Sequence, residues 1–439
     1  MIQSERKYAD VLIVGAGPAG LAAATACLSR NAKFIVVDSG SPVDMRDRDN
    51  HREICSGVGG AGLFSDGKFS FFPSATNLWT LADRECLGAS YAWLARAIDP
   101  LGIHAPSFPD LTSIDSGNAD RGQDDLCIKG YPSFHMPYEN RVGLTRSLAS
   151  PIRDSLITDT NIKAIRFDAG TNRFVCITST PGQSEFTFLT VKSVIFAGGR
   201  FGPVQWGTIF SDIATVYRRL EVGVRIQQAA TDFFLKDDPR LDPKVLLRSN
   251  DPRYEWRTFC CCRDGEVMVT RCSGLTSVSG RSDGLKCGQS NVGFHVRISD
   301  QALGTELWPH VLQTLRNLPL SAPMPESLPL FLADGLGNGA KKESKQAAIL
   351  GPRVARLVAE GLDRLRKSSL PFLDDDALVI APALEGVAFY PEVDAGLRCG
   401  ALPLWVVGDA TGLFRGLSAA MISGYYAGTR ASDYLGSQT

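Results

Sequence analysis

The sequence lacks a C-x-x-C pair, a large net charge of either sign and any long apolar run. Lysine and arginine number 46 and aspartate and glutamate 47, so the net charge is −1 and no long-range field attracts nucleic acid or an anionic membrane. The longest apolar stretch, Leu378 to Tyr390, is too short to span a bilayer and contains Glu385. We therefore expect no nucleic-acid partner and no membrane partner.

The eleven cysteines are scattered, and the absence of C-x-x-C argues against a thioredoxin-like redox centre. Three of them are adjacent. In a strand, Cys260 and Cys262 would share one face and Cys261 the other. We interpret them as small packing residues. A thiol beside a redox cofactor and a metal ligand set are the alternatives, but few further soft ligands are near, so we expect no metal site.

The segment from Tyr8 to Asp38 has the pattern of one complete strand–helix–strand unit. A short apolar strand over Val11 to Val14 precedes an Ala-rich helix expected over Pro18 to Arg30. A second strand follows over Phe34 to Val37. Two parallel strands joined through a helix in this way form the βαβ unit of dinucleotide-binding proteins.

The turn inside this unit carries three glycines in G-x-G-x-x-G spacing. The first permits the tight turn, the second lets backbone approach a pyrophosphate, and the third lets helix and strand pack closely. The helix N-terminus presents N–H groups to the phosphates, and the acid that closes the second strand can accept both ribose hydroxyls. We expect cofactor contacts from Gly15, Gly17, Pro18, Ala19, Gly20, Asp38 and Ser39.

A second nucleotide-binding element, GDATG at 408–412, lies near the end of the chain. A buried strand (LWVV) leads into it, and a small-residue helix follows. An aspartate here can accept a hydrogen bond from a ribityl hydroxyl of FAD, while the helix N-terminus faces the pyrophosphate or the flavin. An NAD dehydrogenase has no reason for this element, so the predicted cofactor is FAD. The residues concerned are Gly408, Asp409, Gly416 and Leu417.

The segment VIFAGGRFG at 194–202 resembles a strand-and-glycine signature of the glutathione-reductase-like FAD superfamily. This resemblance implies that the chain crosses back beneath the dinucleotide here. It also implies that the strand opening a β-meander contacts adenine through its backbone. The matching positions are Ala197, Gly198 and Gly199, with Ile162 on the meander strand.

A glycine-rich segment, SGVGGAGLFSDGKFS at 56–70, has no apolar strand before it and no Ala-rich helix after it. A second Rossmann site is therefore not expected, and the glycine density favours backbone packed against a flat ligand. In the superfamily this segment passes the isoalloxazine ring, which implies N–H contacts to flavin N5 or O4. The candidates are Gly59, Gly60, Ala61, Gly62, Ser65 and Lys68.

A narrower resemblance links the chain to the uncharacterised FAD-dependent dehydrogenases of bacteria and archaea. It is carried by SGVGGAGLFSDGKFS together with VGVRIQ (222–227), TFCCCRDGEV (258–267) and GQSNVGF (288–294). The chain departs from that family at Arg263-Asp264, where the family has Pro-Gly, and in 330–344. Substrate identity does not transfer.

The expected fold class is α/β: a Rossmann-like FAD-binding domain, with a parallel sheet and a β-meander crossover, plus a mixed α+β substrate domain. The pattern assigns 1–72, 136–205 and 396–439 to a discontinuous FAD-binding domain. It assigns 73–135 to a helical and loop insertion, a candidate lid, and 206–395 to the substrate domain. The first strand begins near residue 10, which leaves no room for a signal peptide, so we expect a cytoplasmic protein.

Few side chains are needed for the chemistry itself, because flavin carries the redox reaction. In NVGFHVRIS, His295 and Arg297 share the strand face opposite the apolar residues, so His295 could look into the flavin cavity. Tyr390 and Glu385 precede the late FAD element, and Arg415 could offset negative charge on reduced flavin. All four are candidates.

The predicted function is an FAD-dependent oxidoreductase that transfers a hydride between a small organic substrate and flavin N5. One alternative is an FAD-dependent monooxygenase using NAD(P)H and O2, although GDATGLFRG lacks the His-Pro stretch usual there. A disulfide reductase is disfavoured by the absence of C-x-x-x-x-C and of a second Rossmann unit, so NAD(P)H would be a transient electron donor. A non-catalytic binding protein related to Rab escort proteins is the third alternative, but those relatives lack intact phosphate glycines. The sequence does not indicate the oligomeric state.

Overall fold

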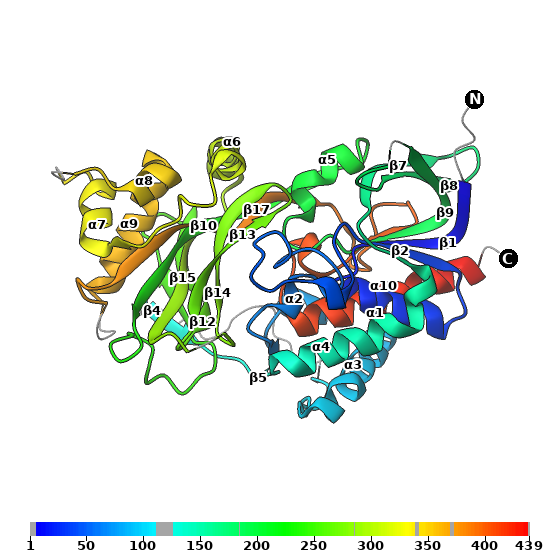
Figure 1. Ribbon diagram of the computed structural model, residues 1–439, viewed down its shortest axis with the longest axis horizontal. Coiled ribbons are helices and arrows are strands. Elements are labelled where there is room, and N and C mark those ends of the chain that lie inside the picture. The colour runs from blue at the N-terminus through cyan, green and yellow to red at the C-terminus, as the bar shows by residue number, and fades with distance from the viewer. Residues whose placement is uncertain are drawn as a thin grey trace. The chain divides into compact units, whose positions relative to one another are not determined.

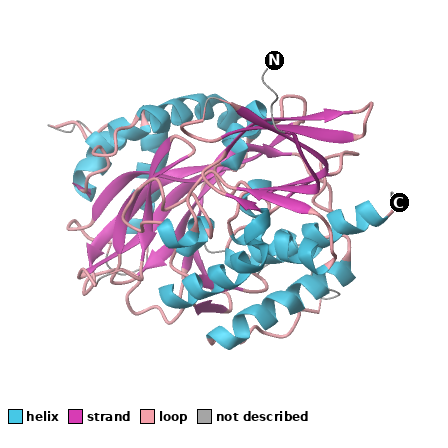
Figure 2. Cartoon of the chain, turned by 45° about the vertical axis from the view of Figure 1, so that its right-hand side comes forward, coloured by secondary structure: helices cyan, strands magenta, loops and turns pink. Residues whose placement is uncertain are grey.

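The computed structural model describes residues 6–110, 126–183, 185–284, 286–338, 342–368 and 373–437, which form two compact units. Unit 1 comprises 1–109, 134–216 and 389–439, and unit 2 comprises 110–133 and 217–388. In both units strands form sheets and helices pack against them (Figure 2). None of the described helices is both long and apolar enough to cross a membrane.

Unit 1 is built on sheet A, whose strands run in the order β6-β2-β1-β9-β8-β7 with β18 also paired to β9. β6, β2, β1, β9 and β18 pair in parallel, and β9, β8 and β7 form an antiparallel meander. The strands of unit 1 are β1 (Arg6–Val14), β2 (Phe34–Val37), β3 (Lys68–Ser70), β5 (Ser133–His135), β6 (Leu156–Ile157), β7 (Asn161–Asp168), β8 (Arg173–Ser179), β9 (Phe186–Phe196) and β18 (Leu404–Val406).

β9 carries the crossover, because the two halves of its outer edge have different partners. Its N-terminal half pairs with β8 from Phe186 onward, and its C-terminal half pairs with β18 at Val194, Ile195 and Phe196. The parallel sheet with a β-meander crossover is therefore as predicted, and the fold class is confirmed.

The helices of unit 1 include a pair of tightly packed helices, α1 and α10, which lie side by side (Figure 1). α1 is apolar all round and largely buried, as expected for a helix held between a sheet and a second helix. A Cβ on Gly424 of α10 would lie 2.0 Å from the Ala19 carbonyl oxygen of α1, so only glycine allows this approach. The helices are α1 (Pro18–Ser29), α2 (Gly60–Leu63), α3 (Arg84–Ile98), α4 (Tyr138–Ala149), α5 (Trp206–Ile209) and α10 (Leu417–Gly436), with 3-10 turns η1 (Val43–Met45), η2 (Thr76–Thr80), η3 (Asp99–Leu101), η5 (Ser150–Ser155), η6 (Gly202–Gln205) and η7 (Gly408–Thr411).

Residues 73–109, which the sequence pattern assigned to an insertion, group with unit 1 in the structure. The reason is packing of α3 on α10: the rings of Trp93 and Tyr425 stack with centroids 4.5 Å apart, and Cys86 lies against the Tyr426 carbonyl. In the rest of the insertion, the described residues 126–133 group with unit 2. Residues 111–125 of the candidate lid lie outside the described residues.

Unit 2 is built on sheet C, in the order β16-β17-β10-β15-β12-β11-β4, and a separate β13–β14 hairpin. α7, α8 and α9 pack together (Figure 1), and Trp256 of β12 donates its indole N–H to the Leu357 carbonyl of α9 (2.7 Å). The elements are β4 (Leu126–Lys129), β10 (Thr215–Ala229), β11 (Lys244–Arg248), β12 (Tyr254–Cys262), β13 (Glu266–Cys272), β14 (Leu275–Arg281), β15 (Gln289–Ile298), β16 (Glu326–Ser327), β17 (Leu378–Pro391), α6 (Gln301–Asn317), α7 (Leu328–Gly335), α8 (Lys345–Leu350) and α9 (Pro352–Arg366).

Candidate functional site

Contacts inside unit 1 require glycine at two of the three positions in the G-x-G-x-x-G turn. A Cβ on Gly20 would lie 1.8 Å from the carbonyl oxygen of Gly15. A Cβ on Gly15, which has φ +99°, would lie 2.6 Å from the carbonyl oxygen of Ala197. These two glycines therefore let α1 pack on its own turn and let the Ala197–Gly199 loop pass beneath it.

Gly17 has no such internal reason to be glycine. Its φ is −71°, which any residue adopts, and the nearest described heavy atom to an added Cβ is the Gly60 Cα at 3.7 Å, an ordinary contact. The space beside Gly17 is thus open within the protein. A pyrophosphate approaching the backbone explains the glycine, so this turn fits FAD.

The glycine-rich segment contacts the N-termini of both long helices of unit 1. A Cβ on Gly62 would lie 2.6 Å from Pro18 Cγ of α1 and 2.7 Å from Leu417 Cδ2 of α10. The Gly59 N–H also donates to the Ala16 carbonyl (2.9 Å). Neither helix has an acidic residue in its first turn, and each has glycine as its N-cap. Two helix N-termini brought together in this way attract an anion such as a pyrophosphate.

Asp38 is 7% exposed, and its carboxylate accepts three backbone N–H groups. They come from Ala16 (2.6 Å), Gly40 (2.9 Å) and Gly57 (3.0 Å). A carboxylate offers about four lone-pair sites, which leaves about one for a ribose hydroxyl where the sequence suggested contacts to both. Asp38 therefore also ties the first glycine turn to the glycine-rich segment.

Arg46 supports the same segment and was not singled out from the sequence. Its buried guanidinium donates to the carbonyls of Val58 (2.9 Å), Gly60 (2.8 Å) and Glu53, and it lies 4.6 Å from the Phe64 ring centroid. Burial lowers the pKa of Arg46 to about 10, with the charge of Asp38 opposing the shift. An arginine in a polar stretch carries no sequence signal of this role, because its partners are main-chain carbonyls.

The late element places Asp409 between two arginines. Its Oδ2 lies 3.4 Å from Arg415 Nε and 3.9 Å from Arg200 Nε. The Gly408 N–H donates to the Ser423 hydroxyl of α10 (3.0 Å), which fixes the turn to that helix. The candidate Arg415 thus has a carboxylate partner within the turn, which holds its guanidinium near the N-terminus of α10.

The remaining predicted cofactor residues of unit 1 have varied surroundings. Ser65 donates to the Gly62 carbonyl (2.9 Å), and Lys68 forms an ion pair with Asp66 (2.7 Å). Ile162 lies on β7, two residues after Thr160, whose N–H donates to the Asp38 carbonyl (2.9 Å). The start of the meander therefore lies beside the Asp38 loop. Ser39 and Ala61 are exposed.

Tyr390 and Glu385, two candidates only five residues apart in the sequence, belong to different units. Tyr390 is 1% exposed, and a Cβ on Gly412 would meet its ring at 2.5 Å, so the ring packs against the GDATG turn. Glu385 lies in unit 2 near His295 and Arg225, and its charge acts on both.

His295 lies in a buried charged layer on one face of sheet C. In this layer Glu221 is fully buried between Arg257 (Oε1–Nε 2.8 Å) and Arg219 (Oε2–Nε 3.1 Å). His295 itself is 1% exposed, and neither ring nitrogen has a hydrogen-bond partner among the described residues. Burial lowers the pKa of His295 to about 4, although the charges of Glu385 and Glu221 act in the opposite direction. The imidazole is therefore neutral near neutral pH.

Similarity to a known protein family also supports FAD as the cofactor. Residues 10–48 match the family model described as an FAD binding domain. The match supports FAD as the cofactor of unit 1. No curated protein matches the sequence.

Several solved structures are similar over nearly the whole chain. A flavoprotein/dehydrogenase from Cytophaga hutchinsonii is 13% identical with a TM-score of 0.42, covering 98% of this chain and 79% of that one. A geranylgeranyl bacteriochlorophyll reductase-like protein from Thermoplasma acidophilum is 14% identical with a TM-score of 0.45, covering 99% and 80%. The anhydrotetracycline hydroxylase OxyS from Streptomyces rimosus is 14% identical with a TM-score of 0.41, covering 98% and 63%.

Proposed function

We propose that this protein is an FAD-dependent oxidoreductase that transfers a hydride between a small organic substrate and flavin N5. The observation that carries the proposal is the meeting of Pro18, Gly62 and Leu417, which brings two helix N-termini and a glycine-rich turn to one place in unit 1. The family match at 10–48 supports the same cofactor. The partner we propose is a small molecule and neither nucleic acid nor membrane.

Each part of unit 1 has a role in holding the cofactor. The N–H groups at the start of α1 and α10 would bind the pyrophosphate, and the open backbone at Gly17 would let it approach. Asp38 would accept a ribose hydroxyl, and Asp409 a ribityl hydroxyl. When bound, FAD supplies the two-electron chemistry. The protein holds and orients it.

We assign the substrate domain to unit 2, and His295 is its candidate proton acceptor. A neutral imidazole can take up the proton that leaves a substrate together with a hydride. The buried carboxylate of Glu385 would then stabilise the imidazolium. The conservative variant His295→Gln should keep the flavin content of the wild type and lower the rate of flavin reduction.

The narrower relationship that we propose is with the uncharacterised FAD-dependent dehydrogenases. Its most specific support is SDGK at 65–68, where Ser65 closes the turn after Gly62 and Lys68 pairs with Asp66. The Arg263-Asp264 departure lies in unit 2, where Arg263 donates to the carbonyls of Leu235, Asp238 and Arg240. Arg263-Asp264 therefore stands where the family has Pro-Gly, and Arg263 anchors the loop.

The test is anaerobic reduction of the purified yellow protein by a panel of metabolites and by NADH and NADPH. Bleaching of the flavin by a metabolite, without oxygen incorporation into the product, supports a dehydrogenase. Bleaching by NAD(P)H followed by reoxidation with a hydroxylated product would replace it with the monooxygenase. A colourless protein that FAD cannot reconstitute would overturn the flavoenzyme proposal and leave the non-catalytic binding protein. Gly17→Val serves as the flavin-poor control.

A further inference from the structure

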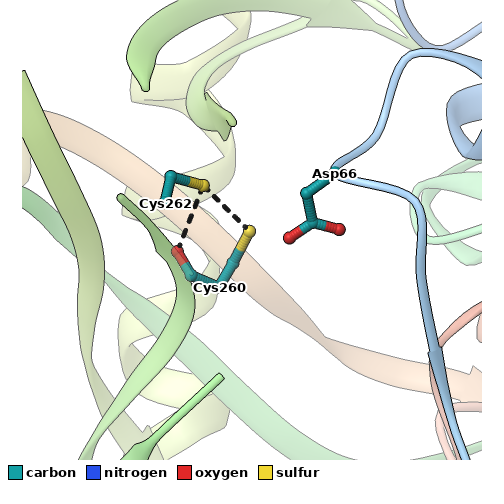
Figure 3. Close-up of side chains that lie close together, drawn as sticks. All are labelled: Asp66, Cys260 and Cys262. Atoms are coloured by element: carbon teal, nitrogen blue, oxygen red, sulfur yellow. Dashed lines mark hydrogen bonds between the residues drawn. The ribbon is translucent and has the colours of Figure 1, made fainter. Parts of the chain in front are cut away.

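Cys260 and Cys262, both in unit 2, have sulfur atoms facing one another at an irregularity of β12. The register with β15 jumps from Phe259↔Gly293 to Cys262↔Asn291, so β12 contains one extra residue. The two sulfurs lie 3.7 Å apart, and the Cys262 sulfur lies 3.6 Å from the Cys260 carbonyl oxygen (Figure 3). In a regular strand, Cα atoms two residues apart are separated by about 6.6 Å. The bulge thus turns two neighbouring side chains into a close pair.

The backbone at this pair is strained. Cys260 has φ +56°, in the left-handed region that non-glycine residues rarely occupy and that costs about 1–3 kcal/mol. A cysteine that served only to fill the core could sit in a regular strand without this cost. The strain therefore points to a role for the paired sulfurs.

A buried guanidinium lies against the pair. Arg225, 3% exposed, donates to the Cys260 carbonyl (2.8 Å), and its Nη2 lies 3.7 Å from the Cys262 sulfur. Its Nε donates to Asn291 (2.6 Å), which fixes the orientation. A Cβ on Gly280 of β14 would lie 2.3 Å from Arg225 Nη2 and 2.7 Å from the Cys262 sulfur, so backbone covers both groups. The charge of Arg225 acts on Cys260 as well as on Cys262. A fixed cation beside the sulfur pair favours the thiolate, the reactive form of cysteine.

The three adjacent cysteines differ in their surroundings. Cys262 is fully buried, whereas Cys260 is half-buried and Cys261, 2% exposed, donates its backbone N–H to Asp242. Cys260 is therefore the thiol that a small molecule can reach first. Cys262 is the one placed to react with it afterwards, and Cys261 is an internal control within the same strand.

We propose that Cys260 and Cys262 form a redox-active dithiol that small-molecule disulfides oxidise to an intramolecular disulfide. The Cys260 thiolate attacks one sulfur of the disulfide RSSR, forming a mixed disulfide and releasing one RS⁻. The Cys262 sulfur then attacks the Cys260 sulfur, breaking the mixed disulfide and releasing the second RS⁻. The two protons of the cysteines go to the two RS⁻ groups, so the dithiol loses two electrons and RSSR becomes two RSH. This site is independent of the proposed flavin reaction.

The test uses the reduced, desalted holoprotein incubated with oxidised glutathione, quenched with acid and alkylated. Trypsin cleavage after Arg257 and Arg263 releases residues 258–263 with all three cysteines. Mass spectrometry of the wild type is expected to show the 258–263 peptide with one alkylated cysteine. Its mass should be two hydrogens below that of the same singly alkylated peptide with two free thiols. Cys261→Ser should form the same disulfide at an unchanged rate.

The other variants assign the two roles. Cys262→Ser should accumulate a stable glutathione adduct on Cys260, and Cys260→Ser should react at least about tenfold more slowly, because only the buried thiol of the pair is left. Arg225→Lys keeps the positive charge but cannot donate to both Asn291 and the Cys260 carbonyl, so it should also react more slowly. Flavin content and thermal unfolding check that each variant is folded. A wild type with three alkylated cysteines, a Cys261→Ser protein without the disulfide, or a Cys260→Ser protein that reacts at the wild-type rate would overturn the proposal.

Discussion

Gly17 and Gly20, three residues apart in one turn, should differ in what substitution changes: FAD affinity at Gly17 and stability at Gly20. Alanine at Gly17 has φ −71° and its nearest neighbour at 3.7 Å. Alanine lowers the entropy of the unfolded chain, which stabilises the folded protein by about 0.4–1 kcal/mol. Alanine is also a poorer helix N-cap than glycine, which destabilises it by about as much. We therefore expect the free energy of unfolding of apo Gly17→Ala to stay within about 1 kcal/mol of wild type. Alanine at Gly20 would place Cβ 1.8 Å from the Gly15 oxygen, an overlap that costs about 3 kcal/mol or more.

Substitution of Gly17 should weaken FAD binding even though it leaves the stability of the apoprotein nearly unchanged. A methyl group at Gly17 occupies the approach to the phosphates, and loss of one charge-assisted hydrogen bond of about 1.5–3 kcal/mol weakens binding roughly 10- to 150-fold. Gly17→Val should weaken it further. Denaturant unfolding of the apoproteins and titration with FAD, followed by flavin fluorescence, measure the two quantities separately. Wild-type FAD affinity in Gly17→Val, or an apo Gly17→Ala as unstable as Gly20→Ala, would refute the reasoning.

Three further predictions concern stability. Asp38→Ala leaves three backbone N–H groups without their acceptor, so apoprotein unfolding should become easier by about 3 kcal/mol and the purified protein should be poor in flavin; wild-type unfolding of this variant would contradict the assigned contacts. His295 has a folded pKa of about 4, below its unfolded value near 6.5, so the unfolded chain takes up a proton first as pH falls. Stability from this group should therefore decline by about 1.4 kcal/mol per pH unit between those values, and His295→Gln should have a shallower decline in denaturant titrations at several pH values. Gly424→Ala should lower the unfolding temperature because its Cβ would lie 2.0 Å from the Ala19 oxygen, whereas Gly436→Ala, with no described heavy atom within 4 Å, should not; equal effects would count against the α1–α10 contact.

Local periodicity was sufficient to predict most elements of unit 1. The strand expected over Val11 to Val14 lies within β1, the predicted Pro18 to Arg30 helix is α1, and the second strand is β2 with the predicted bounds. The strand that precedes the Ala197–Gly199 glycines is part of β9 and pairs in parallel with β1, in agreement with the predicted β-meander crossover. These segments carry their own patterns because each is buried on both faces or contains a turn that only glycine allows.

Contacts between distant segments could not be predicted in the same way. No role could be predicted for Arg46, since its partners are the carbonyls of a loop whose conformation is not encoded in a side-chain pattern. Alternation placed Cys260 and Cys262 on one face, but the bulge that brings their sulfurs to 3.7 Å depends on the register with β15. His295 was expected on the polar face, and the structure shows that this face is also buried.

The division of unit 1 into three stretches of chain also sets an order of events during synthesis. β18 supplies the last partner of β9, and α10 packs along α1, yet both are translated after the whole of 217–388. The early βαβ unit therefore leaves the ribosome with one side of α1 uncovered, while residues 217–388 can complete sheet C with the earlier strand β4 before β18 and α10 are made. A chain stopped before residue 417 has the first phosphate turn but not the second helix N-terminus. FAD binding therefore requires that nearly the whole chain has been synthesised.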